Sequence, residues 1–236
     1  MIIWLASYPR SGNTFLRIIL HRLYGVSTYS IYDDNDPVAQ RVGPDFLGYR
    51  PKPNCRELMA NGPDLFFTKT HKRRKGDANP AIYLVRDGRD AVVSQAHLKL
   101  SEQRVDGNYT RAFHKYLREA IIRPYIREQP SSGTWGGNVL SWLAATNAPI
   151  SMLRYEDLIV DPRESVSRAV SAVAPELVPL PDCDIPSFGE LRGSDELFFR
   201  RGMVGAYRDE MPAELHELFW AQAENTQAME LLSYTK

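Results

Sequence analysis

The sequence is poor in cysteine, has no excess of either charge and contains no long apolar run, and each absence excludes a class of protein. Its two cysteines, Cys55 and Cys183, lie far apart and form neither a metal-binding spacing nor a disulfide framework. Lysine plus arginine equals aspartate plus glutamate at 29 each, so no overall basic field indicates binding of nucleic acid. Any site for an anion must therefore be local.

Long apolar segments are missing as well. The first apolar run, residues 2–6, ends before Pro9 and Arg10 and is too short for the core of a signal peptide. No later run approaches the ~18 apolar residues that cross a membrane. We therefore expect a cytoplasmic protein without a membrane span. Its 236 residues are enough for one domain, which we place over residues 1–236.

A nucleotide-binding P-loop of the usual form is also absent. That pattern needs two glycines around four residues and then Lys-Ser or Lys-Thr, whereas residues 7–17 read Ser-Tyr-Pro-Arg-Ser-Gly-Asn-Thr-Phe-Leu-Arg. An apolar run, a segment with Pro and Gly, and a second apolar run predict a strand, a tight loop and a helix. The unpaired N–H groups at the start of such a helix attract a tetrahedral oxyanion such as phosphate or sulfate. The side chains that can join them are those of Arg10, Ser11, Asn13 and Thr14.

A basic stretch follows the second predicted strand, residues 65–68. Residues 69–76 read Lys-Thr-His-Lys-Arg-Arg-Lys-Gly, and ligands of open α/β sheets usually bind at this end of the strands. Lys69 and His71 stand two positions apart, so their side chains can face the same side of an extended chain. For the basic residues beyond them, a solvated loop is the preferred interpretation.

Two further stretches are suited to binding phosphate. Arg86 follows the third predicted strand, residues 81–85, and Ser94 lies about two turns along the next predicted helix. These two side chains could grip one phosphate from two sides. Arg200 and Arg201 place two guanidinium groups beside a glycine, and such a pair suits bidentate binding of phosphate.

Taken in order, these stretches resemble the sulfotransferases that use 3′-phosphoadenosine 5′-phosphosulfate (PAPS). The first loop is similar to the family's Tyr-Pro-Lys-Ser-Gly-Thr-Thr-Trp loop, with Arg10, Asn13 and Phe15 in place of Lys, Thr and Trp. The family also has a Lys-Thr-His element, here residues 69–71, between its first loop and its 3′-phosphate site. The segment from Arg86 to Ser94 resembles that second site, and Arg-Arg-Gly resembles the Arg-Lys-Gly loop that closes over the 3′-phosphate.

The resemblance implies a role for each of these residues. His71 would be the catalytic base, and Lys69 and Arg10 would stabilise the transferred group and the leaving phosphate. Tyr155, after another predicted strand, would approach the adenine, although packing at a sheet edge explains it equally well. Phe188 would stack on the adenine opposite the aromatic residue of the first loop. The complete set of donor-binding residues that the resemblance implies is Arg10, Ser11, Gly12, Asn13, Thr14, Phe15, Arg86, Ser94, Tyr155, Phe188, Arg200, Arg201 and Gly202.

The alternation of strands and helices predicts an α/β protein with a parallel sheet flanked by helices, and the resemblance implies the P-loop-like sulfotransferase fold. The expected reaction transfers a sulfuryl group from PAPS to a hydroxyl or amine of a small molecule or glycoconjugate, without a metal ion. Two alternatives stay open. One is a small-molecule kinase of the P-loop class, and the other is a nucleotide-binding module without catalytic activity.

The acceptor is not identified by the sequence. Residues 27–63 and 99–137 are where the family varies its acceptor pocket, and we expect the first to be a long irregular segment, either a binding loop or a surface loop. Residues 175–186 are expected to form a linker and residues 212–232 a single terminal helix. The family's dimerisation motif is not matched, so the oligomeric state stays open.

Overall fold

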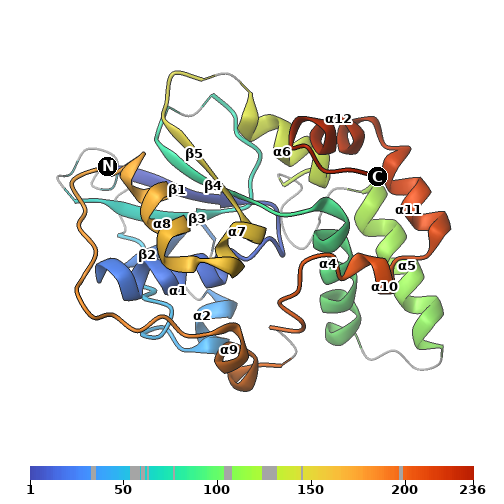
Figure 1. The fold of residues 1–236 in the computed structure, drawn as a ribbon, viewed down its shortest axis with the longest axis horizontal. Coiled ribbons are helices and arrows are strands. Elements are labelled where there is room, and N and C mark those ends of the chain that lie inside the picture. Colours follow the sequence, from blue (N-terminus) through green and yellow to red (C-terminus); the bar gives the residue numbers. More distant parts are fainter. Residues whose placement is uncertain are drawn as a thin grey trace.

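In the described part of the chain, five strands form one parallel sheet (Figure 1). The computed structural model describes residues 1–32, 36–53, 59, 62, 64–76, 78–103, 108–123, 132–144, 146–196 and 199–236. The strands are β1 (Ile2–Ser7), β2 (Thr28–Ser30), β3 (Phe66–Thr70), β4 (Ala81–Val85) and β5 (Ile150–Arg154). Their spatial order is β2-β3-β1-β4-β5, and all four pairings are parallel. The predicted fold class is confirmed.

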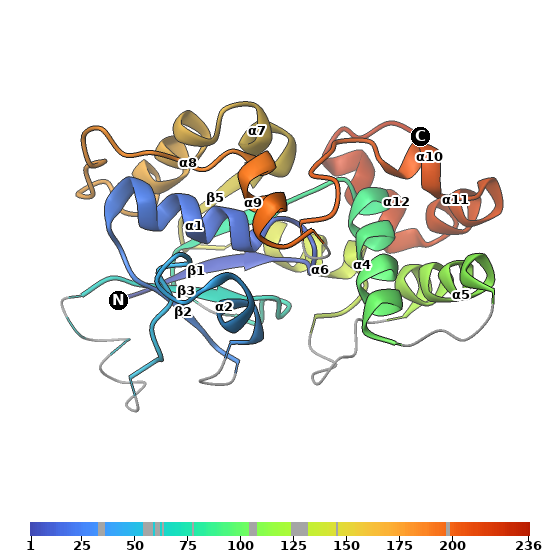
Figure 2. The same cartoon turned by 90° about the horizontal axis from the view of Figure 1, so that it is seen from below.

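Helices cover both faces of this sheet. They are α1 (Asn13–Tyr24), α2 (Pro37–Val42), α4 (Gly88–Glu102), α5 (Tyr109–Ile122), α6 (Trp135–Leu143), α7 (Tyr155–Val160), α8 (Pro162–Ser171), α9 (Phe188–Ser194), α10 (Tyr207–Glu210), α11 (Ala213–Trp220) and α12 (Ala223–Leu231). Figure 2 shows α1, α7 and α8 over one face, while α4, α5, α10, α11 and α12 gather at one end of the molecule. Among the described residues, no helix is both long and apolar enough to span a membrane.

The central strand explains why the chain has two apolar cores. Ile2 and Trp4 of β1 join the core beneath α4, α5, α6, α11 and α12, whereas Ile3 and Leu5 join the core beneath α1 and α8. Successive side chains of a strand point to opposite faces, and a strand buried on both faces is a continuous apolar run. The unbroken apolar sequence of residues 2–6 is therefore the signature of this central position.

Two expectations about the second predicted strand and its surroundings were wrong. The strand extends to Thr70, so Lys69 lies inside it and His71 is the first residue after it. The segment of residues 27–63 is not irregular throughout, because it contains β2, which pairs with β3, and α2. With only three residues, β2 is too short to show a period, and its position is set by pairing with its neighbour.

The expected single helix at the carboxyl end was also wrong, because α11 and α12 are separate helices. The Thr226 hydroxyl donates to the carbonyl oxygen of Trp220 (2.5 Å), and the Asn225 side chain donates to that of Phe219 (3.3 Å). Side chains that bond to backbone in this way compete with continued helix. The turn between them lets α12 pack on α6.

The sheet order brings three strand ends together. Because β1 lies between β3 and β4, Ala6 stands beside Thr70 and Ser7 beside Leu84. The residues that follow these strands therefore meet at one edge of the sheet. These are the first loop after β1, His71 after β3 and Arg86 after β4.

The close packing of α6 on α12 yields a stability prediction. The Gly136 amide donates to Asn225 Oδ1 (3.0 Å), and a Cβ atom at Gly136 would lie 2.3 Å from the carbonyl carbon of Glu224. Backbone cannot turn aside as a side chain can, so Gly136→Ala should lower the free energy of unfolding by about 1–3 kcal/mol. Urea denaturation measures this loss.

A second glycine supplies the matched control for that measurement. Gly193 lies in α9, and a Cβ there would meet no atom within 4 Å. Gly193→Ala should leave the protein unchanged or stabilise it by up to about 1 kcal/mol, because alanine favours helix. Equal losses at the two positions would contradict the proposed packing effect at Gly136.

Candidate active site

The loop between β1 and α1 is built around two residues with left-handed backbone. Arg10 has φ of 65° and Gly12 has φ of 99°. A Cβ atom on Gly12 would lie 2.6 Å from Cδ2 of Tyr155, so this position has room only for glycine. The Asn13 amide closes the loop by donating to the carbonyl oxygen of Leu5 (2.9 Å) and to the Ser7 hydroxyl (3.2 Å). Asn13 therefore shapes the loop through its side-chain N–H groups, and its contact with a donor stays a prediction.

The polar groups of this loop are prepared for an anion. The N-cap of α1 is Gly12, which has no side chain to cap the helix. In α4, by contrast, the side chain of Asp87 forms the cap. Among the described residues, the buried Ser11 hydroxyl and Arg86 Nε have no hydrogen-bond partner. Buried polar groups are normally paired. An uncapped helix start beside orphaned donors is therefore the environment that an oxyanion would complete.

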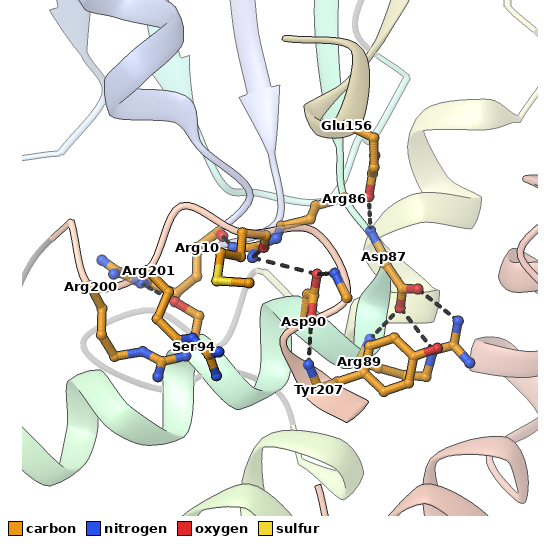
Figure 3. A network of polar contacts seen from close by, with 12 residues as sticks. Arg10, Arg86, Asp87, Arg89, Asp90, Ser94, Glu156, Arg200, Arg201 and Tyr207 are labelled. Carbon is orange, nitrogen blue, oxygen red and sulfur yellow. Dashed lines mark hydrogen bonds and ion pairs between the residues drawn. The ribbon is translucent and has the colours of Figure 1, made fainter. Parts of the chain in front are cut away.

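Arg86 links the parts of the site. The residue is 7% exposed, and its two terminal nitrogens donate to the carbonyl oxygens of Arg10 (3.3 Å) and Met203 (3.0 Å). One of them also lies 3.6 Å from Asp90 Oδ2. Asp90 in turn accepts the backbone N–H groups of Gly205 (2.8 Å) and Tyr207 (2.9 Å). Figure 3 shows this network at the start of α4. Arg86 and Asp90 thus hold the first loop and the loop after Arg201 against one helix.

The other predicted phosphate ligands are found in two pairs. Arg10 Nε donates to the Ser94 hydroxyl (3.2 Å), so these two residues from distant segments are in contact. Arg200 makes two hydrogen bonds to Glu210 (2.5 and 2.8 Å), and Arg201 makes one (2.7 Å). Several donors, His97 among them, hold the pKa of the Glu210 carboxyl far below its usual value although burial opposes this. Glu210 is therefore charged and pairs with both arginines.

The predicted adenine-contacting residues lie around the first loop. The rings of Phe15 and Phe188 meet edge to face, with centroids 6.5 Å apart, and a Cβ on Gly202 would touch the Phe188 ring. Tyr155 is 3% exposed and packs between Gly12 and the Arg86 guanidinium, which lies 4.4 Å from the ring centroid. The structure thus shows the packing role of Tyr155, and its approach to adenine stays a prediction.

His71 is held in one orientation by three contacts. Its N–H donates to the Tyr32 hydroxyl (2.8 Å), its carbonyl oxygen accepts from the Asn138 side chain (2.9 Å), and its Nδ1 lies 2.9 Å from the carbonyl oxygen of Ser7. A carbonyl oxygen only accepts, so Nδ1 carries the proton and Nε2 carries the lone pair. Burial and the nearby Lys69 lower the pKa of His71 to about 3. The ring is therefore neutral at ordinary pH.

Lys69 is the second predicted catalytic residue at this edge. Its side chain is buried in β3, and its Nζ lies 3.7 Å from Asp36 Oδ2 and 5.8 Å from the centroid of the Tyr32 ring. Burial lowers the pKa of Lys69 to about 8, against the attraction of Asp36. Its ammonium group stays largely protonated near pH 7.

Four carboxylates of the site were missed by the sequence analysis: Asp36, Asp90, Glu156 and Glu210. Glu156 accepts the Asp87 N–H (3.0 Å; Figure 3) and the Tyr234 hydroxyl (3.0 Å), which ties the segment of Tyr234 to the start of α4. Asp90 and Glu156 lie within segments that resemble the family, residues 86–94 and 155–158, and Asp36 had a local signal because Asp followed by Pro marks a helix start. In the described residues, no group of three His, Cys, Asp or Glu side chains is placed to hold a metal, and a metal-free reaction stays a prediction.

Comparison with known proteins gives this geometry a family. A family model described as the sulfotransferase domain matches residues 2–171. Cytosolic sulfotransferase 5 of Arabidopsis thaliana is 22% identical over 249 residues, covering 89% of this chain and 74% of the relative. Cytosolic sulfotransferase 10 of the same plant is 25% identical, with coverage of 89% and 73%.

A solved structure matches over nearly the whole chain. The crystal structure of mouse sulfotransferase SULT7A1 complexed with PAP covers 99% of this chain and 89% of that one, with a TM-score of 0.59 and 18% identity. This likeness confirms the predicted P-loop-like sulfotransferase fold. The family match includes the first loop, Lys69, His71, Arg86 and Ser94, whereas the loop with Arg200 lies beyond it. The match to the family model covers more than half of the chain and excludes the alternative of a P-loop kinase. This protein therefore belongs to the sulfotransferase family of enzymes.

Proposed function

We propose that the enzyme transfers the sulfuryl group of PAPS to a hydroxyl or amine of a small molecule or glycoconjugate, with His71 as the general base. The observation that carries this proposal is the fixed, neutral His71 ring at the sheet edge. Its Nδ1 is bonded to Ser7, the last residue before the anion loop, so its Nε2 can accept a proton from an acceptor beside that loop.

The residues present fit the donor. The uncapped start of α1, the Ser11 hydroxyl and Arg86 Nε supply donors that lack a partner among the described residues, as an anionic ligand requires. Bound there, PAPS supplies an activated sulfuryl group whose transfer is chemically similar to phosphoryl transfer. In such reactions charge spreads over the equatorial oxygens and catalysis consists of positioning and electrostatic stabilisation.

The cations of the site divide between two tasks in this proposal. Lys69 and Arg10 stabilise charge at the transferred group and the leaving phosphate, and His71 takes the acceptor's proton. Arg86, Ser94, Arg200 and Arg201 bind the 3′-phosphate. Glu210 pairs with both arginines of the last loop, so this carboxylate competes with a phosphate for them.

Incubation with labelled PAPS and a panel of alcohols, phenols, amines and glycosides tests the function. We expect labelled product from at least one hydroxyl- or amine-bearing acceptor, identified by mass spectrometry. Absence of product from every acceptor would contradict the proposed activity, and phosphoryl transfer from labelled ATP would contradict the donor.

The first prediction concerns nucleotide selectivity. The desulfated donor, 3′-phosphoadenosine 5′-phosphate, should bind more tightly than ATP or AMP. Of these three nucleotides, only the desulfated donor carries a 3′-phosphate for Arg86 and Ser94. Hydrogen bonds to charged groups contribute about 1.5–3 kcal/mol each, so the advantage over AMP should be at least about tenfold. Calorimetry measures it, and tighter binding of ATP would contradict the proposal.

The second prediction concerns the base. His71→Ala should lower turnover by about 10²- to 10⁴-fold, the usual contribution of a general base, with little change in donor affinity. His216→Ala is the matched control, since His216 lies on α11 beside the rings of Tyr207 and Trp220, outside the predicted acceptor regions, and should leave turnover unchanged. Full activity of the His71 variant would show that the base lies elsewhere.

The third prediction concerns pH. A lowered histidine pKa keeps His71 neutral down to about pH 3, so kcat/KM should show no fall from His71 between about pH 7 and pH 5. The ammonium of Lys69, with a pKa of about 8, loses its proton as pH rises. We therefore expect kcat/KM to fall on the alkaline side near that value. A profile of kcat/KM from about pH 5 to pH 10 measures both limbs. A fall of kcat/KM centred near pH 6.5 that disappears in His71→Ala would show that His71 has an ordinary histidine pKa, against this prediction.

A further inference from the structure

Asp36 is a buried carboxylate shared by two cations. Its residue is 1% exposed, its Oδ2 accepts from Arg17 (2.9 Å), and its Oδ1 accepts from the Val38 N–H (2.9 Å) at the start of α2. The same Oδ2 lies 3.7 Å from Lys69 Nζ. Arg17 is fully buried in α1 and also donates to the Thr28 hydroxyl (3.1 Å). One negative charge thus stands between two positive charges inside the protein.

These charges act on Lys69 in opposite directions. The charged and titratable groups that face it are Asp36 before α2, Arg17 of α1, the Tyr32 ring after β2 and His71 after its own strand. Burial and Arg17 disfavour the ammonium form, and Asp36 is the carboxylate that favours it. Arginine stays charged in proteins, so Arg17 cannot relieve the repulsion by losing its proton.

We propose that Asp36 is a positioning residue for sulfuryl transfer, which keeps the Lys69 ammonium charged and holds it beside His71. This inference rests on the proposed role of Lys69. The segment that supplies Asp36 lies between β2 and α2, within the region expected to form the acceptor pocket. A residue of the expected acceptor region would therefore act on Lys69, which stabilises charge at the transferred group and the leaving phosphate.

A purely structural role for Asp36 is the rival explanation, since the carboxylate also joins α1 to α2. The two explanations differ in their effect on Lys69. A structural role alone would lower stability at every pH, and any change in the proton affinity of Lys69 would leave the pH dependence of turnover as it is. The positioning role would change that proton affinity, and with it the pH dependence of turnover.

The test is Asp36→Asn in the full chain. The pKa of Lys69 is read from the pH dependence of its acetylation, quantified by peptide mass spectrometry in the donor-free protein. We expect this pKa to fall by at least about one unit, which is a tenfold weaker hold on the proton. Turnover should fall most at alkaline pH, with the alkaline limb of kcat/KM displaced to lower pH, while donor KM changes less.

Glu119→Gln is the matched control, because Glu119 pairs with Lys99 (2.5 Å) on α4 and α5, away from Lys69. It removes one carboxylate from a lysine pair in the same way. We expect it to change neither the Lys69 pKa nor the pH profile.

A second variant covers the case in which Asp36→Asn does not fold because Arg17 is left unpaired. Arg17→Met/Asp36→Asn removes the attraction and the smaller repulsion together. The pKa of Lys69 should then lie below that of the wild type and above that of Asp36→Asn. A pKa at or above the wild-type value in either variant overturns the proposal.

The remaining outcome separates this inference from the function on which it rests. If the pKa of Lys69 falls in Asp36→Asn while turnover near pH 8 is unchanged, Lys69 has no part in catalysis. That result overturns both the role of Lys69 and the positioning role of Asp36. An unchanged pKa overturns the role of Asp36 alone.

Discussion

The parallel pairing of β1 with both β3 and β4 is the constraint on which the site depends. It places the ends of three strands side by side, so the anion loop, His71 and Arg86 meet although they are far apart in the sequence. Ser7 shows the consequence most directly. It ends β1, its carbonyl oxygen fixes the tautomer of His71, and its hydroxyl accepts from the Asn13 side chain that closes the loop. A change in the register of one strand would separate these groups.

Buried carboxylates hold the cations in place. The chain has no net charge, yet three functional cations of the site have an acidic neighbour: Asp36 beside Lys69, Asp90 beside Arg86, and Glu210 beside Arg200. Removing one partner of a buried pair is costly because the other charge is left unpaired. These pairs therefore fix the geometry of the basic residues before a ligand arrives, at the cost of part of their attraction for it.

The proton affinities of His71 and Lys69 at the sheet edge follow from their burial. Burial and the charge of Lys69 disfavour the charged form of His71, while burial and the charge of Arg17 disfavour the charged form of Lys69. The histidine responds by staying neutral and the lysine by staying charged with a reduced hold on its proton. A neutral imidazole beside an ammonium group is the combination that proton removal and anion stabilisation require. The charge of Lys69 depends on the Asp36 carboxylate, which lies outside both the first loop and the Lys-Thr-His element.

The sequence by itself determined the sheet class, the strand of residues 2–6 and the order of the anion motifs, because apolar runs and residue spacing are local properties. It missed β2, which is three residues long, and the break between α11 and α12. Only the tertiary structure decided that Tyr155 packs on Gly12, that Glu210 pairs with the predicted phosphate-binding arginines, and that Asp36 stands beside Lys69. These contacts join residues from different elements, and no local pattern states which of many carboxylates will meet a given cation once the strands have paired.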